Sequence, residues 1–81
     1  MRLDKYLKVT RIIKRRTVAN EACDAAHVTV NGRPAKASYD VKVGDLLEIT
    51  FGARTLRIRV LEVKETVGKD AASSLYEVVE P

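Results

Sequence analysis

The first sixteen residues carry most of the chemistry that this 81-residue sequence offers. They hold seven basic side chains and one acid, Asp4, a net charge of +6, whereas the other 65 residues hold eight basic and ten acidic side chains, a net charge of −2. A local excess of cations attracts an anionic polymer, so this segment predicts a nucleic-acid-binding surface. The basic residues are Arg2, Lys5, Lys8, Arg11, Lys14, Arg15 and Arg16.

Few other residues form a set that could catalyse a reaction or hold a metal. One histidine, His27, and one cysteine, Cys23, do not make a histidine-based metal site or a Ser-His-Asp set. Residues 67–70 resemble the end of a P-loop motif, but the earlier glycine of that motif is missing and Asp70 stands where Ser or Thr is needed. We therefore expect no enzyme, no cofactor and no metal. Cys23 is expected to fill the core, and a lone cysteine indicates a reducing compartment, which predicts a cytoplasmic protein.

Two short helices must position the basic segment. An apolar stripe at helical spacing begins at Leu3 and predicts a helix from near Arg2 to near Arg11. Residues 12–16 are expected to form a basic connecting turn, because a longer helix would bury the ammonium group of Lys14.

A second helix is expected from about residue 17 to residue 25. Its small apolar residues fall on one side of the helical wheel, with Asn20, Glu21 and Asp24 on the other. Thr17 is the expected N-cap, because its hydroxyl can accept a hydrogen bond from a free backbone amide.

After His27 the hydrophobic period changes from 3.6 to 2, which predicts strands. Residues 28–30 alternate, Asn31-Gly32 is a strong hairpin turn, and Pro34 limits the return strand to a short edge piece.

Further strands are expected at 46–51, 55–63 and 75–79, with a polar loop at 68–74. Three apolar residues of the first of these strands are expected to share one face: Leu47, Ile49 and Phe51. Two helices followed by strands predict one α+β domain over residues 1–81, with the helices packed on a small, mostly antiparallel sheet.

Three blocks of residues resemble the S4 RNA-binding domain family. The first block is Arg2 to Leu7 with Arg11, Arg16 and Ala19 at set spacings after it; the second is 28–32, Val-Thr-Val-Asn-Gly, and the third is 43–45, Val-Gly-Asp. The resemblance covers roughly residues 1–50. It implies an S4-like fold for that core, with 51–81 as a short β extension and no separate catalytic domain.

Residues 14–17, 36–38 and 71–76 are also similar to small stand-alone bacterial S4 proteins, the RqcP family of ribosome-associated quality control, which are relatives of the heat-shock S4 proteins. This resemblance implies a non-enzymatic factor that binds a stalled large ribosomal subunit through 23S rRNA and peptidyl-tRNA. It also implies support for alanine tailing of the nascent chain with an RqcH-type factor. We expect a monomer.

The same resemblance implies which residues meet RNA. Asp4 would orient neighbouring arginines, Lys36 and Ser38 would make secondary contacts, and Asn31 is a further expected RNA-binding residue. The contacts to RNA phosphates would come from Arg2, Lys5, Lys8, Arg11, Lys14, Arg15 and Arg16.

Two residues depart from the pattern of the family. Many S4 domains have glycine where this chain has Ala26; if that position needs a positive φ, alanine costs about 1 kcal/mol there or forces a different helix exit. Arg15 replaces a serine often found before the arginine of the second helix, which removes the usual cap and adds a phosphate-seeking charge.

Other functions share the same features. A heat-shock-type role in recycling blocked large subunits, or a role in ribosome assembly, would use the same RNA-binding face. A protein-interaction or membrane-surface module is a further alternative, although the apolar stripe of the first helix is narrow and is needed for the core. Arg57 and Arg59 are expected on the outer face of the sheet, as solvated charges or as a second RNA contact.

Overall fold

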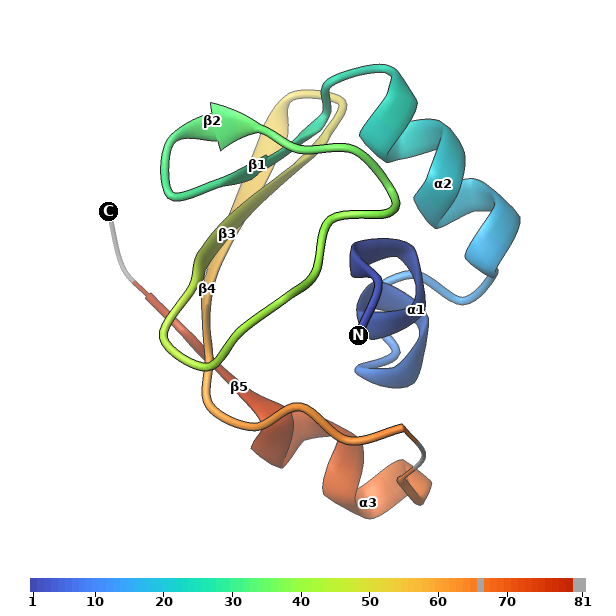
Figure 1. Ribbon diagram of the computed structural model, residues 1–81, viewed down its shortest axis with the longest axis vertical. Helices are drawn as coiled ribbons and strands as arrows, with labels where there is room; N and C mark the ends of the chain where they lie inside the picture. Colours follow the sequence, from blue (N-terminus) through green and yellow to red (C-terminus); the bar gives the residue numbers. More distant parts are fainter. Residues whose placement is uncertain (66, 80–81) are drawn as a thin grey trace.

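The computed structural model describes residues 1–65 and 67–79, and in it two helices cover one face of a five-stranded antiparallel sheet (Figure 1). The helices are α1 (Leu3–Val9) and α2 (Arg16–Asp24). The strands are β1 (Val28–Val30), β2 (Arg33–Pro34), β3 (Leu46–Phe51), β4 (Arg54–Val60) and β5 (Tyr76–Val78), in the order β2-β1-β3-β4-β5. The predicted α+β, S4-like fold is confirmed, and the expected β extension joins the same sheet.

The core lies between the two helices and the sheet and is mainly aliphatic. Leu3, Tyr6 and Leu7 of α1 are fully buried against Leu47 and Ile49 of β3 and their neighbours in one cluster. The prediction that Cys23 fills the core is confirmed, since it is buried in the same cluster. Burial of this stripe orients α1, so the basic residues between the apolar positions are directed outward.

Helix α1 ends at Val9, two residues earlier than predicted. The Thr10 hydroxyl donates hydrogen bonds to the carbonyls of Tyr6 (2.9 Å) and Leu7 (3.2 Å), which closes the last turn. Arg11 then adopts a left-handed conformation with φ of 62°, so the helix cannot continue through it.

The prediction of Thr17 as an N-cap is wrong. Arg15 occupies that position in an extended conformation, without a side-chain capping bond, and Thr17 lies inside α2. Ile13 is buried in the core and anchors the connecting turn, and the Arg15 carbonyl accepts the first intrahelical hydrogen bond from the Ala19 amide at 3.1 Å. The helix therefore begins one residue earlier than expected.

Helix α2 ends at the residue that departs from the family pattern. Ala26 has a φ of 62°, its amide donates to the Cys23 carbonyl (3.0 Å), and the His27 amide donates to the Ala22 carbonyl (2.9 Å). This pair of bonds is a Schellman C-cap, which normally has glycine at the left-handed position. The helix therefore ends with this cap, although alanine is strained in the left-handed conformation.

Two predicted strands differ at their ends. Phe51 was expected to share one face with Leu47 and Ile49, but unlike them it is 44% exposed, because it lies at the end of the β3–β4 hairpin, where it pairs with Arg54. Strand β4 ends at Val60 rather than at residue 63, because the amides of Leu61 and Glu62 donate to the carbonyl of Leu75 and draw the chain out of the sheet.

Residues 68–74 do not form the predicted polar loop. They hold a short helix, α3 (Lys69–Ala72), and begin a 3-10 turn, η1 (Ser73–Leu75), so that β5 starts at Tyr76. Ala72 and Leu75 are buried, and the Tyr6 hydroxyl donates to the Leu75 carbonyl at 2.9 Å. The C-terminal extension is therefore fastened to α1 (Figure 1). Within the described residues, no helix is both long enough and apolar enough to span a membrane.

Candidate nucleic-acid interface

The seven cations of the N-terminal segment lie on α1, on the turn after it and at the start of α2. Six of them are exposed and Lys5 is half-buried. Because α1 and α2 pack directly against each other, the segments that carry these side chains adjoin one another (Figure 1). We call this set of seven residues the basic surface.

One buried carboxylate, Asp4, ties the basic surface together. Asp4 is only 2% exposed, yet it forms an ion pair with one arginine near the start of each helix. The Nε atoms of Arg2 and Arg16 lie 3.2 Å and 3.3 Å from its carboxylate oxygens. The Nη2 atom of Arg2 (3.3 Å), the Lys5 amide (2.8 Å) and the Asn20 side chain (3.3 Å) donate further hydrogen bonds to it. The geometry agrees with the expectation that Asp4 orients neighbouring arginines.

Asp4 stays ionised in this environment. Burial alone would raise its pKa, but hydrogen bonds from Arg2, Asn20, Arg16 and the Lys5 amide together hold the pKa of Asp4 below its ordinary value. The ionised carboxylate of Asp4 binds one edge of each of the two guanidinium groups. Each guanidinium therefore keeps other N–H donors that can bind a phosphate.

Four cations of the basic surface form no ion pair with any residue in the ranges 1–65 and 67–79; they are Lys8, Arg11, Lys14 and Arg15. Lys5, in contrast, pairs with Glu65. Unpaired exposed cations are the groups that phosphates would neutralise with the smallest loss of existing contacts.

The segment after β2 borders the start of α1. The amide of Leu3 donates to the Tyr39 carbonyl (2.8 Å), and the amide of Asp4 donates to the Ala37 carbonyl (3.2 Å). Lys36 and Ser38, which flank Ala37, are exposed. The structure thus brings both predicted secondary contacts next to the basic surface.

Asn31 lies elsewhere, in the tight turn between β1 and β2, with φ of 52° followed by 85° at Gly32. Its side-chain amide is already used on both sides: Nδ2 donates to Asp45 (3.1 Å), and Oδ1 accepts from the Leu46 amide (3.0 Å). These bonds hold the turn on β3. An RNA contact from Asn31 stays a prediction.

Arg57 and Arg59 do not join the basic surface. Each pairs with an acid on a neighbouring strand, Arg57 with Glu48 at 3.1 Å and Arg59 with Glu77 at 3.9 Å. The pairs follow the strand register, in which Glu48 lies opposite Arg57 and Arg59 opposite Glu77. They form cross-strand charge ladders rather than free cations.

Asn20 belongs to the site but was not predicted from the sequence. Its position on the polar side of the second helix was the available indication, but that position alone does not predict which group the amide meets. The contact with Asp4 depends on how α1 packs on α2. Among the residues that the structure describes, no group of three or more His, Cys, Asp or Glu is gathered to hold a metal.

Known proteins share this architecture and sequence. The family model described as S4 domain matches residues 1–47. A protein named RQC P-site tRNA stabilizing factor from Streptococcus pneumoniae is 54% identical over 79 residues, covering 98% of this chain and 90% of the relative. The protein of the same name from Bacillus subtilis is 48% identical, covering 98% of this chain and 92% of the relative.

Heat-shock proteins are also similar. Heat shock protein 15 homolog from Aeromonas salmonicida is 33% identical, covering 99% of this chain and 61% of that protein. The solved structure of Heat Shock Protein 15 from Vibrio cholerae, described as trimeric, superposes with a TM-score of 0.91 at 29% identity, covering 98% of this chain and 81% of the other.

Proposed function

This chain belongs to the S4 domain family, within the group that includes the RQC P-site tRNA stabilizing factors, and we propose that it binds tRNA and ribosomal RNA in ribosome-associated quality control. The relatives of this name from Streptococcus pneumoniae and Bacillus subtilis match nearly the whole chain, including the C-terminal extension. The basic surface is the part of the molecule that would meet RNA.

The observation that carries the proposal is the unpaired charge at the α1–α2 turn. Lys8, Arg11, Lys14 and Arg15 are exposed and form no ion pair with the described residues, while Asp4 holds Arg2 and Arg16 on the same surface. Each phosphate that the surface neutralises releases counterions, so log affinity should fall against log salt by about 0.7 to 0.9 per contact.

The surface suits the backbone and shape of a folded RNA. Tyr6, the only aromatic residue of the first two helices, is fully buried, so it offers no exposed ring on which a base could stack. The cations of α1 and α2 would therefore contact phosphates rather than bases. Folded tRNA and rRNA offer such phosphate arrays.

The finer parts of the proposal follow from the family resemblance. The chain would bind a large ribosomal subunit that retains a peptidyl-tRNA, with 23S rRNA and the tRNA as its two RNA contacts. There it would support alanine tailing by an RqcH-type factor, as a monomer in the cytoplasm and without catalysing a reaction itself. No metal or cofactor is required for this role.

A second candidate is the recycling of blocked large subunits by a heat-shock-type S4 protein. The TM-score of 0.91 with Heat Shock Protein 15 supports it. Both functions would use the same basic surface. Loss of alanine addition when this chain is removed would favour the first function, and unchanged addition would favour the second.

The binding experiment is co-sedimentation with large subunits, with and without peptidyl-tRNA, across a salt series. The test variant is Lys14→Glu/Arg15→Glu, which reverses two exposed cations but leaves both partners of Asp4 in place. The matched control is Lys42→Glu/Arg54→Glu, which makes the same change in net charge at exposed residues off the basic surface.

We expect the wild type and the control to prefer subunits that carry tRNA, and the test variant to lose binding. Equal binding by all three proteins would contradict the assignment of the basic surface. Equal loss in both variants would mean that net charge alone drives binding. Equal affinity for subunits with and without tRNA would favour an assembly role.

A further inference from the structure

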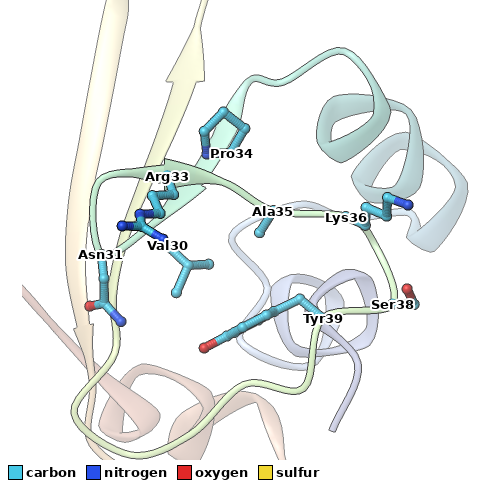
Figure 2. Close-up of a pocket in the computed structure, with 8 residues that line it drawn as sticks. All are labelled: Val30, Asn31, Arg33, Pro34, Ala35, Lys36, Ser38 and Tyr39. Carbon is cyan, nitrogen blue, oxygen red and sulfur yellow. The ribbon is translucent and has the colours of Figure 1, made fainter.

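A hollow of about 720 Å³ lies beside the basic surface, between the β1–β2 hairpin and the segment that follows it (Figure 2). Its volume falls in the range of about 300 to 1,000 Å³ that is usual for small-ligand sites. Apolar groups form part of its lining, including Val30, Pro34 and Ala35. The hollow was not identified from the sequence.

An aromatic ring forms one wall of the hollow. Tyr39 is half-buried, and its hydroxyl donates to Asp45 at 2.9 Å, while Asp45 also accepts from the Lys42 amide at 3.0 Å. The hydrogen bond to Asp45 raises the pKa of Tyr39, so the hydroxyl remains a donor and the ring is held in place. A ring fixed before binding loses little conformational entropy when a planar group packs on it.

Two cations lie at the hollow. Arg33 pairs with Val30 in the β1–β2 register, so it shares the face of the sheet that carries the core, and its side chain lies at the open hollow (Figure 2). Lys36 points toward α2. Neither residue forms an ion pair with the part of the chain that the structure describes.

The spacing of these cations suits a nucleotide and its neighbouring phosphates. Three residues of extended chain span at most about 10 Å, and both side chains are long and exposed. Lys36 adjoins Ala37, whose carbonyl accepts from the Asp4 amide, so positive charge continues from the basic surface to the hollow. A strand of RNA that leaves the basic surface would meet Lys36 first and Arg33 second.

We propose that this hollow receives one unpaired nucleotide of the RNA bound on the basic surface, with the base against Tyr39 and the flanking phosphates at Arg33 and Lys36. The inference rests on the proposed RNA-binding function and adds a feature of the RNA that the protein selects. A paired base cannot enter, because it is stacked in a helix. The protein therefore distinguishes an RNA with an unpaired nucleotide from a fully paired one.

The test uses a short RNA hairpin with one bulged 2-aminopurine nucleotide and the same hairpin without it. Stacking of one base on an aromatic side chain predicts about tenfold tighter binding of the bulged hairpin by the full chain, with a change in 2-aminopurine fluorescence. Ala35→Leu fills the hollow and Arg33→Ala removes a phosphate contact. Each should bring the affinity ratio close to one while leaving binding of the paired hairpin within about twofold.

Arg54→Ala is the matched control, since it removes an exposed arginine of the same sheet outside the hollow, and it should keep the tenfold ratio. Circular dichroism establishes that each variant is folded. A ratio near one in the wild type, or a tenfold ratio that survives Ala35→Leu, would overturn the inference but not the RNA-binding function. No binding of either hairpin would overturn both. Arg33-dependent binding of a polyglutamate peptide, without preference for the bulged hairpin, would show that the hollow takes a protein partner instead.

Discussion

Arg11 combines backbone strain with a cation of the basic surface, and replacing it should separate stability from RNA binding. Its φ of 62° places a residue with a long side chain in the left-handed region directly after α1. Strained backbone is commonly retained where a side chain has a function. We therefore expect Arg11→Gly to yield a protein that is more stable and binds RNA less tightly.

The expected change in the stability of Arg11→Gly is the sum of two opposing effects. A left-handed conformation costs a residue other than glycine about 1 to 2 kcal/mol, which glycine avoids. Glycine also lowers the free energy of unfolding by about 0.4 to 1 kcal/mol relative to alanine, because it gives the unfolded chain more conformational freedom. The net gain is about 0.5 to 1 kcal/mol, which corresponds to a rise in Tm of about 2 to 8 °C for a domain of this size.

The comparison that isolates the strain is Arg11→Gly against Arg11→Ala, measured by thermal and urea unfolding. Both variants remove the same charge, but only glycine relieves the positive φ. Both should weaken binding to large subunits and reduce the salt slope by about 0.7 to 0.9. Equal stability of the two variants would refute the strain argument, and unchanged affinity in both would remove Arg11 from the RNA-binding face.

Three further predictions concern other residues. Ala26→Gly should raise the free energy of unfolding by about 0.5 to 1 kcal/mol, whereas Ala25→Gly, at a φ of −85°, should lower it by a similar amount; urea unfolding of both checks the sign. Because the pKa of Asp4 is lowered from its ordinary value of 3.8, the stability it contributes is complete above that pH and is lost as pH falls through the lower pKa of the folded state. The difference in unfolding free energy between wild type and Asp4→Asn should therefore shrink on acidification below about pH 4, and a constant difference would contradict the assigned hydrogen bonds. Burial, followed by the charges of nearby carboxylates, raises the pKa of Cys23 from 9.0 to about 11, so alkylation by iodoacetamide at pH 7.5 should be slow and should accelerate in urea.

Local patterns were enough to predict the parts of the fold in which neighbouring residues decide the conformation. The strand at 28–30, the Asn31-Gly32 turn and the short return strand at Pro34 are all confirmed, because alternation, positive φ and the missing proline N–H act within a few residues. The prediction of a loop at residues 68–74 was wrong, because the helical turns there are stabilised by contacts with residues distant in sequence. Ala72 and Leu75 are buried, and the Tyr6 hydroxyl donates to the Leu75 carbonyl.

The candidate site divides in the same way. The cluster of cations could be expected from the charge near the N-terminus, and the orienting position of Asp4 was implied by the resemblance to the S4 family. The contact of Asn20 with Asp4 and the hollow beside Tyr39 could not, since each requires segments that are distant in sequence to pack together. The sequence did not decide whether Arg57 and Arg59 are solvated charges or a second RNA contact. The strand register places an acid opposite each of them.

The bond between Tyr6 and Leu75 sets the order in which the molecule can be completed during synthesis. The two residues are 69 positions apart, and translation at about 5 to 20 residues per second needs roughly 3 to 14 s to cover that distance. Until Leu75 emerges, α1 lacks the contact that fastens it to the C-terminal extension, and contacts of such long sequence separation form late in folding. The basic segment therefore emerges from the ribosome before the residue that fastens α1 through Tyr6, so during synthesis the basic surface first exists without this contact.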